Sequence, residues 1–505
     1  AYTLENILNY NKTFGDHTVG ATFLQSIQTE RREDMSVQVV GLPYESQLFY
    51  NLGSTGDIEN YGSNLREWQL ASFMGRVNYS FKNKYLLQVT VRSDGSSRLA
   101  EGNQWSTFPG ISAGWRIIDE PFMDNLGFFD ELKLRGSWGI VGNTSINPYQ
   151  TAGRLVQTQY VFGNTPALGF RLNEIPNPDL GWERTATVNA GVDFGVLNGR
   201  VTGTVDYYVS NTTDLLLRQQ LPFTSGYSQV LQNVGHTRTR GIEVVLSTVN
   251  FDTPSGFRWT TDINWGRNTE EIVELYNGAV DDVGSGWFIG EPLNVFFDYQ
   301  KIGIWQANEV NEAREFDNST PGEIKVADLN GNGEADPGDR TILGSDVPSW
   351  TGGITNRFEY KGFDLSFFFF ARWGHMLQSR FHDSANSLFA RYNNLNVDYW
   401  TPTNPTNSNP RPNLNQERPR YVSTLRYFDG SFVKLRNVNF GYNLPKSVTD
   451  KLKVGSLRVY GSVQNPWFYS RFEAFDPEVE YDDAQIGVND VPLSAVYLMG
   501  LNIKF

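Results

Sequence analysis

The sequence contains no cysteine, only four histidines and no long apolar run. The absence of cysteine excludes disulfides and thiolate metal sites, and it is compatible with a chain that crosses an oxidising periplasm. The densest apolar stretch, residues 365–371, is far shorter than the ~18 residues that a membrane-spanning helix needs. Basic side chains are also in deficit: 42 stand against 56 acidic ones, for a net charge of −14. This balance argues against a nucleic-acid partner.

Turn signals are abundant along all 505 residues, which include 48 glycines and 14% aromatic side chains. No break in composition divides the chain into domains, so the regular turns indicate one large all-β domain. The mean hydropathy is −0.42. A low mean does not exclude a membrane protein, because the strands of a membrane barrel carry apolar side chains only at alternate positions.

Apolar and polar residues alternate with a period of two in many segments, as in residues 85–92, 131–141, 259–265 and 457–464. This period predicts β-strands with one apolar face. Aromatic residues recur near the ends of these segments, where rings of a membrane barrel form girdles at the two interfaces. They are Trp68, Tyr79, Phe81, Tyr85, Trp115, Trp138, Phe194, Tyr207, Trp259, Trp265 and Trp373.

Short turns alternate with long irregular stretches. Residues 197–200 read LNGR, and an Asn-Gly pair favours a type I′ hairpin because both residues must take positive φ. Residues 14–17, 82–84 and 360–363 are similar. The predicted long loops are 33–66, 142–182, 211–230, 271–293, 306–348, 377–429 and 468–492. This asymmetry is typical of outer-membrane barrels, which have short periplasmic turns and long extracellular loops.

The predicted fold is therefore an antiparallel transmembrane β-barrel, and a soluble sandwich or propeller is the alternative. Alternation slips within residues 432–442, which predicts a bulge near Arg436 and Asn437. We count about sixteen strands, a number that closes a porin-sized barrel and is also compatible with part of a larger one. No charged and then apolar signal segment follows Ala1, so an exported protein would have lost it or would carry it outside this sequence.

Several motifs together resemble one family. Residues 427–438 read YFDGSFVKLRNV, and GYNLP follows at 441–445. VQNPW at 463–467 leads to FDPE at 475–478, and the chain ends in MGLNIKF. Earlier, VRSDGSSR at 91–98 precedes SAGW at 112–115. In this combination, along essentially the whole chain, the sequence resembles the SusC/RagA family of TonB-linked outer-membrane transporters.

The resemblance implies a 22-stranded barrel around an N-terminal plug. Residues 1–505 would then be the C-terminal portion of one barrel domain, with about 16 of its 22 strands. The N-terminal strands, the plug and the TonB-contacting segment would come from a separate polypeptide or from an N-terminal part outside this sequence. The implied partners are a SusD-like surface lipoprotein and the TonB complex.

The resemblance also implies the function: TonB-dependent import of glycan oligomers or oligopeptides across the bacterial outer membrane, with no catalytic residue. A passive porin or structural barrel is the alternative, and a soluble glycan-binding or hydrolytic β-protein is a third possibility. Nine loop aromatics could contact substrate, partner or neighbouring loops: Trp287, Phe288, Trp305, Tyr392, Tyr399, Trp400, Trp467, Phe468 and Tyr469.

Residues 328–339 form the sharpest local motif. Oxygen-bearing side chains stand at positions 1, 3, 5, 9 and 12, a glycine stands at position 6, and position 7 would offer a backbone carbonyl. This is the pattern of a calcium loop, in which hard oxygens surround one ion. The predicted ligands of a structural calcium ion are Asp328, Asn330, Asn332, Glu334, Asp336 and Asp339. A metal-free turn rich in Asn, Gly and Asp is the alternative.

Three other motifs are weaker evidence for a chemical function. Residues 110–114 match the G-x-S-x-G pattern of hydrolases, but that chemistry needs a strand-to-helix elbow, and here the strand pattern continues. The histidines, at 17, 236, 375 and 382, lack the spacing of zinc ligands. An acidic cluster could serve a glycosidase, but its loop setting indicates a solvated surface or a second weak cation site. Its members are Glu473, Asp476, Glu478, Glu480, Asp482 and Asp483.

Overall fold

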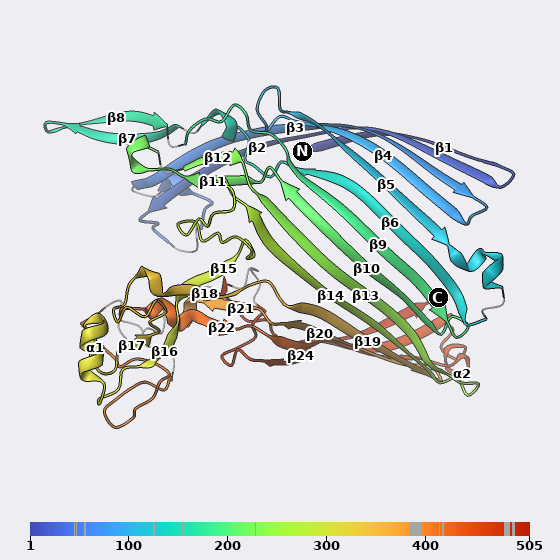
Figure 1. Ribbon diagram of the computed structural model, residues 1–505. Coiled ribbons are helices and arrows are strands. Elements are labelled where there is room, and N and C mark those ends of the chain that lie inside the picture. The colour runs from blue at the N-terminus through green and yellow to red at the C-terminus, as the bar shows by residue number, and fades with distance from the viewer. Residues whose placement is uncertain are drawn as a thin grey trace.

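The computed structural model describes residues 1–505 except 45, 47, 55–56, 125–126, 154, 173, 228, 383–395, 414, 417–418, 479–484 and 487–489. Its main element is a curved antiparallel sheet of fifteen strands, called the wall below. Neighbours in the wall follow chain order throughout (Figure 1). The strands are β1 (Tyr2–Phe14), β2 (His17–Val40), β3 (Asp57–Phe81), β4 (Tyr85–Ser96), β5 (Trp105–Arg116), β6 (Phe129–Asn143), β9 (Glu183–Val196), β10 (Val201–Thr213), β13 (His236–Asp252), β14 (Arg258–Glu274), β19 (Trp350–Tyr360), β20 (Phe363–Trp373), β23 (Phe432–Asn443), β24 (Ser456–Ser470) and β26 (Val496–Lys504).

Connections between wall strands differ at its two ends. One end, the turn end, has the connections 15–16, 82–84, 117–128, 197–200, 253–257, 361–362 and 444–455. The other, the loop end, has 41–56, 97–104, 144–182, 214–235, 275–349, 374–431 and 471–495. In Figure 1 the loop end lies at the left and the turn end at the right. The predicted asymmetry is confirmed, and Asn198 and Gly199 have the positive φ that their turn requires, 56° and 72°.

The connections contain the remaining elements, and all those named below except the second helix lie at the loop end. Small sheets pair β7 (Leu155–Phe162) with β8 (Thr165–Leu172), β11 (Leu216–Gln220) with β12 (Gln229–Asn233), β15 (Val295–Tyr299) with β18 (Arg340–Ser345), β16 (Lys301–Ile304) with β17 (Ile324–Val326), and β21 (Met376–Ser379) with both β22 (Tyr427–Asp429) and β25 (Gln485–Ile486). The α-helices are α1 (Val310–Asp317) and α2 (Lys446–Thr449). None of the helices formed by the described residues has the length and hydrophobicity to cross a bilayer.

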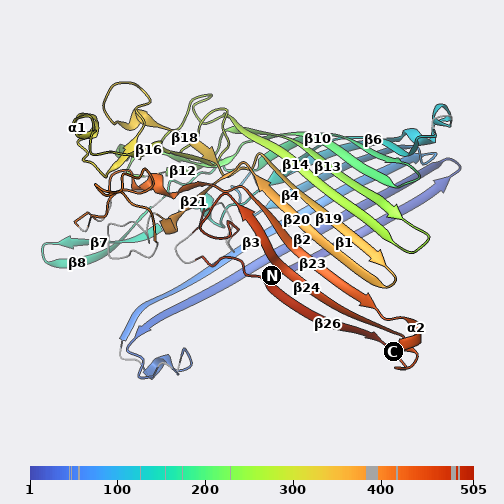
Figure 2. The same ribbon diagram turned by 90° about the horizontal axis from the view of Figure 1, so that it is seen from below.

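The wall has fifteen strands among the described residues, in agreement with the expected count of about sixteen. One expectation about the wall needs correction. Residues 33–66 are mostly strand rather than loop: β2 and β3 continue as a two-stranded ribbon beyond their neighbours (Figure 2). Charged residues interrupt the alternation there, and most positions of the ribbon are exposed on both faces.

The predicted bulge is confirmed at Arg436. In the pairing of β23 with β20, Asn437 lies opposite Phe368 and Leu435 opposite Phe369, so Arg436 has no partner. The pairing with β24 shifts at the same residue. The bulge keeps apolar side chains on one face although the sequence changes parity.

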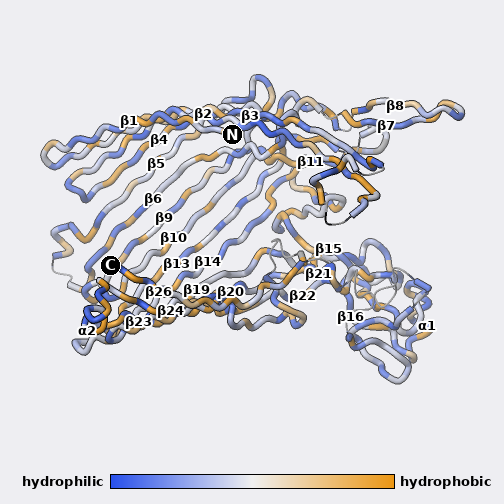
Figure 3. Tube along the Cα trace, turned by 180° about the vertical axis from the view of Figure 1, so that it is seen from behind, coloured by the Kyte–Doolittle hydropathy of each residue, from blue (hydrophilic) through white to orange (hydrophobic). Residues whose placement is uncertain are grey.

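The wall has one apolar and one polar face, because side chains alternate along each strand. In Figure 3 short hydrophobic and hydrophilic stretches alternate along the strands. Large apolar side chains of the apolar face are well exposed, including Val77, Leu87, Ile111, Trp138 and Val188. So large an exposed apolar surface fits contact with lipid.

Most of the predicted girdle aromatics lie on this apolar face. On β19 and β20, Trp350 stacks on Trp373 near the loop end with ring centroids 6.5 Å apart, and on β14 Trp259 stacks on Phe358 of β19 near the turn end at 5.4 Å. Trp68 is an exception, because its position along β3 places it on the opposite face, beneath the Arg98 guanidinium at 4.1 Å.

Candidate functional site

The polar face carries a continuous set of ion pairs across β6, β9 and β10. Arg135 donates through Nε to both carboxylate oxygens of Asp193, at 3.0 and 2.9 Å, and its Nη2 lies 2.9 Å from Asp206 Oδ2. Lys133 Nζ lies 3.6 Å from Asp193. Gly191 lies between Arg135 and Asp206 in the register. A Cβ added there would be 2.3 Å from Asp206 Oδ1, so glycine is required for this contact.

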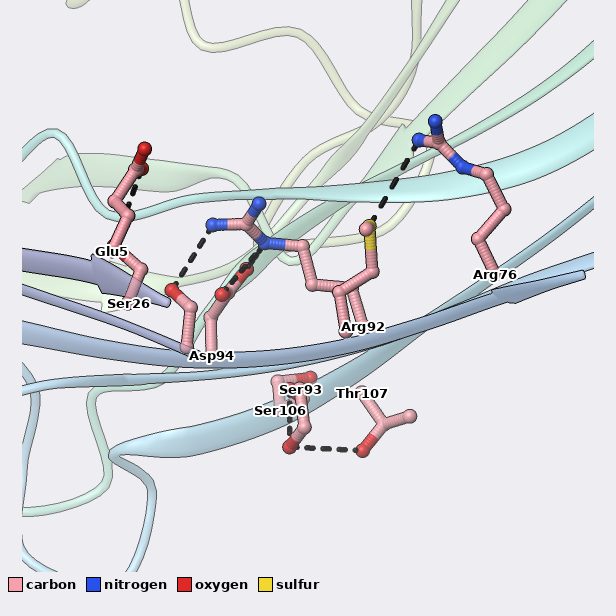
Figure 4. A network of polar contacts seen from close by, with 10 residues as sticks. Glu5, Ser26, Arg76, Arg92, Ser93, Asp94, Ser106 and Thr107 are labelled. Carbon is pink, nitrogen blue, oxygen red and sulfur yellow. Dashed lines mark hydrogen bonds and ion pairs between the residues drawn. The ribbon is translucent and has the colours of Figure 1, made fainter. Parts of the chain in front are cut away.

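A second network crosses β3 and β4 (Figure 4). Arg92 donates through Nε to both carboxylate oxygens of Asp94 at 2.8 and 2.9 Å, and through Nη2 to Ser72 Oγ at 3.0 Å. Figure 4 shows Arg76 on the same side of the strands as Arg92, with Thr107 on the other side. These ion pairs hold the long side chains against the wall and leave it lined with hydrogen-bonding groups.

Two cavities follow the polar face, with volumes of about 500 and 610 Å³. Polar side chains that line the first include Asn78, Gln88, Ser112, Lys133, Arg135 and Asn189. Such a surface can bind polar solutes or polypeptide through hydrogen bonds and charge, without covalent chemistry.

Apolar cores lie in the loops rather than in the wall, and they give the loop end a folded structure. One cluster of buried side chains is Leu99, Ala100, Ile146, Leu180 and Leu231; a second is Ile304, Ile324, Val326 and Trp400; a third is Leu377, Phe472 and Ile486. Each joins segments distant in sequence, so burial of apolar surface fixes the loops to one another. The loop end therefore offers a shaped surface above the wall.

A buried ionic centre joins β23 to the loop 471–495. Lys434 Nζ lies 2.6 Å from Asp476 Oδ2 and 2.9 Å from Glu478 Oε2. Arg436, the bulge residue, also pairs with Glu478 and stacks over Phe370 at 4.1 Å. The prediction of a solvated acidic surface is therefore wrong for Asp476 and Glu478; Glu480, Asp482 and Asp483 lie outside the described residues. The missed signal is the apolar setting of Lys434 in the sequence, which calls for a buried partner.

The predicted calcium loop folds into a compact turn that brings its acidic and amide side chains together. Asp328 accepts hydrogen bonds from the backbone N–H groups of Gly331, at 2.7 Å, and Gly333, at 2.9 Å. Asn332 Nδ2 donates to Asp336 Oδ2 at 2.7 Å, and Asn330 Nδ2 also points at that carboxylate.

Asp339 closes the turn and is fully buried. It accepts from the backbone N–H groups of Leu329, Asn330 and Asp336, at 2.9, 3.3 and 3.0 Å. These hydrogen bonds, the one from Asp336 foremost, hold the pKa of the Asp339 carboxyl below its usual range. Glu334 supplies an exposed side chain. Within the described part of the chain no group of three His, Cys, Asp or Glu side chains is arranged to hold a metal. The predicted calcium site would also use amide and backbone oxygens as ligands, and it stays a prediction.

The hydrolase-like motif and the four histidines lie in strands or contact neighbouring side chains. Residues 110–114 lie within strand β5, so the hydrolase elbow is absent there. His17 Nδ1 lies 2.8 Å from Tyr79 OH, and His382 Nδ1 lies 2.7 Å from Ser379 Oγ. His236 contacts Asn211, and His375 is buried beside Phe432.

The loop aromatics divide between core and surface. Phe288, Trp305 and Trp400 are buried, so they stabilise the loops rather than contact a solute. Trp467 and Tyr469 are about half exposed on the apolar face of β24. Phe468 and Tyr399 are also exposed, Trp287 is half-buried, and Tyr392 lies outside the described residues.

Comparisons with known proteins agree with this architecture. The family model described as TonB dependent receptor-like, beta-barrel, matches residues 1–465. The chain is 33% identical to TonB-dependent receptor P3 of Formosa agariphila and 32% identical to TonB-dependent receptor SusC of Bacteroides thetaiotaomicron. These matches cover 99% and 96% of this chain but 52% and 49% of the relatives, so the chain spans about half the length of the curated relatives it matches.

Among solved structures, the RagAB peptide transporter superposes with a TM-score of 0.83 at 23% identity. That match covers 100% of this chain and 55% of the other, and it supports the barrel fold. The family consists of receptors and transporters rather than enzymes. The match of the family model over most of the sequence, together with the SusC relative, places this chain in the SusC/RagA group of the TonB-dependent receptor-like β-barrel family, with its wall in the bacterial outer membrane.

Proposed function

We propose that this chain forms a large part of the wall of a TonB-dependent importer for glycan oligomers or oligopeptides. The observation that supports this function best is the polar face, where ion pairs such as Arg135 with Asp193 and Asp206 line cavities on a sheet whose other face is apolar. A polar lining favours passage of hydrophilic solutes, and an apolar exterior fits the bilayer.

In the proposed mechanism, a SusD-like lipoprotein captures substrate over the loop end, and TonB displaces a plug supplied by the rest of the protein. The residues of this chain act without covalent chemistry. The apolar clusters and the Lys434 centre hold the loops in place for lid contact. The ion pairs of the polar face keep the inner wall rigid and hydrated. The similarity to SusC and the fold of RagAB support both partners.

The test is uptake by cells that carry the full-length gene. Labelled glycan oligomers and labelled oligopeptides should each be offered to the parent strain, to a strain lacking this gene and to a strain lacking TonB. The proposal expects that uptake of one class is lost in both mutants and in parent cells treated with an uncoupler. Uptake that needs this gene but neither TonB nor the proton-motive force would instead identify a passive porin.

The partner is tested separately. Full-length protein carrying an affinity tag should be extracted in mild detergent from its native membrane and the co-purified proteins identified. We expect a surface lipoprotein among the co-purified proteins. Its absence from the purified complex would contradict the partnership.

We also propose that the turn 328–339 binds a structural calcium ion. Asp328, Asp336 and Asp339 would supply carboxylate oxygens, Asn330 and Asn332 amide oxygens, and Glu334 its backbone carbonyl. The fit is supported by the convergence of these side chains on one turn. Both carboxylate oxygens of Asp328, and Asp339 Oδ2, each accept a single N–H bond and therefore retain a lone pair for an ion. The ion would stabilise the loop 275–349, and it would take no part in transport chemistry.

A further inference from the structure

Three arginines lie on the apolar face of the wall, where lipid-facing residues are expected. On β13, Arg238 and Arg240 are four and two residues before Ile242, and on β14 Arg267 is two residues after Trp265. Residues separated by an even number of positions lie on the same face of a strand. The register of β13 with β14 is unbroken from Thr237 to Val249. All three side chains therefore emerge on the same face as the apolar residues below them.

The arginines stand at the height of the loop-end aromatic girdle. On the far side of β14, Gly266 pairs with Thr351, which places Trp350 level with Arg267. Trp350 stacks with Trp373 of the next strand. Aromatic girdles mark the boundary between hydrocarbon and head groups. The guanidinium groups thus lie at the level of the head groups of the outer leaflet.

A cavity of about 320 Å³ opens between these strands and the loop 275–349. The three arginines line it, together with small residues of the loop, which are Gly290, Pro292, Ser345, Val347, Pro348 and Ser349. Two carboxylates also line it: Glu271 lies 3.3 Å from Arg238 Nη1 and 3.5 Å from Arg240 Nη2, and Glu270 is adjacent.

Charge in this cavity is unbalanced. Arg267 is exposed and has no acidic partner within 4.0 Å among the described residues, while Arg238 and Arg240 share Glu271. Three cations thus face two carboxylates. Arginine presents planar, bidentate donors that match phosphate oxygens. An apolar surface directly below would accommodate acyl chains.

We propose that this cavity binds the phosphate of an outer-leaflet lipid head group, of the phosphorylated glycolipid class. Arg240 and Arg267 would contact the phosphate, and Arg238, which is fixed by Asn211 at 3.1 Å, would support them. Aromatic side chains at the head-group level and apolar side chains below favour a lipid over a soluble protein partner. The bound lipid would orient the barrel in the bilayer and fix the loop 275–349 against the wall.

The test uses the full-length protein in nanodiscs of phosphatidylcholine, with bisphosphorylated lipid A as the probe and native mass spectrometry as the readout. Each lost cation weakens binding to an anionic lipid surface by about fivefold, so the double variant R240Q/R267Q should bind about 25-fold more weakly. Lys451→Gln with Lys453→Gln, an equal change of charge beyond the turn end, should leave binding unchanged. If the double variant fails to insert, Arg267→Gln alone should show the fivefold loss.

Two further arms identify the ligand. Enzymatically dephosphorylated lipid A should bind the wild type as weakly as intact lipid A binds the double variant. Equal binding of both lipids, or equal binding by R240Q/R267Q and the wild type, would overturn the proposal. Inorganic phosphate that occupies the cavity as tightly as lipid A would show a soluble-anion site, and it would also overturn the lipid assignment.

Discussion

Lys434 Nζ lies 2.6 Å from Asp476 Oδ2, and the two side chains are only 1% and 3% exposed. Lys434 belongs to wall strand β23, and Asp476 belongs to the loop 471–495. An isolated buried charge costs several kcal/mol, so each residue depends on the other. The pair therefore fixes the position of the last long loop relative to the wall.

Replacing Lys434 by Met should release that loop. The substitution leaves the buried Asp476 without its cation, while the half-buried Glu478 keeps Arg436, and breaking a buried pair typically costs about 3–5 kcal/mol. We expect faster proteolysis within residues 471–495 and a lower unfolding temperature. Limited proteolysis in detergent, followed by mass spectrometry, measures the first effect.

The double variant K434M/D476N tests whether the effect comes from charge. It removes both members of the closest pair, so the loop should regain part of its protection. Lys446→Met, at an exposed position, is the matched control and should behave as wild type. Equal cleavage of K434M and wild type would contradict a role of this pair in holding the loop.

Acid should loosen the start of the loop 374–431. Burial, with Arg372 nearby, lowers the pKa of His375 from its ordinary 6.5 to about 4. Between these pH values the unfolded chain takes up a proton that the folded site excludes, so stability is lost as pH falls from 6.5 toward 4. The shift corresponds to at most about 3 kcal/mol.

Hydrogen exchange of residues 375–379 and 427–431, corrected for the intrinsic pH effect, measures this opening. His375→Gln should remove the pH dependence, whereas His17→Gln, beside Tyr79 at the turn end, should retain it. An identical pH profile for wild type and His375→Gln would show that protonation of this ring has no part in the opening.

The hairpin between β19 and β20 should be sensitive to a single methyl group. Gly362 has φ +89°, and a Cβ there would lie 2.7 Å from the carbonyl oxygen of Asn443. We expect Gly362→Ala to destabilise the wall by about 1–3 kcal/mol, from backbone strain and the clash. Gly15→Ala is the control: its φ is also positive, at +61°, but a Cβ would meet no atom within 4 Å. The midpoint of urea unfolding should fall further for Gly362→Ala; equal midpoints would contradict the clash.

The strands of the wall are predictable because their pattern of apolar and polar residues depends only on neighbouring positions in the sequence. Alternation shows which side chains share a face, and the change of parity across residues 432–442 was enough to locate the bulge at Arg436. Turn chemistry likewise located the hairpins at 197–200 and 361–362.

Partnerships between distant segments were not predictable in this way. The sequence predicts a solvated position for Asp476, because its partner Lys434 is 42 residues away and no periodicity connects the two residues. Arg135 and Asp206 are 71 residues apart in sequence and meet only because Gly191 lies between them. The sequence alone is compatible with substrate contact and with packing for Trp305 and Trp400. In the structure both side chains are buried in the loops.

Calcium binding by the turn 328–339 gives the last prediction. Asp328→Ala with Asp339→Ala should abolish one bound calcium per chain, measured by elemental analysis, and should make residues 306–348 sensitive to protease. Because Asp339 also accepts three backbone hydrogen bonds, its loss loosens the turn even without metal. Asp336→Asn removes the charge that favours calcium and keeps an acceptor for Gly338, but it loses the hydrogen bond from Asn332 Nδ2. That variant should lose calcium, and a chelator should increase the cleavage of the wild type but leave the cleavage of the variant unchanged. Glu334→Gln, at an exposed side chain whose predicted contribution is its carbonyl, should retain the ion. If the wild-type protein contains no calcium and a chelator leaves its cleavage unchanged, the turn is stabilised by hydrogen bonds alone and the calcium prediction is wrong.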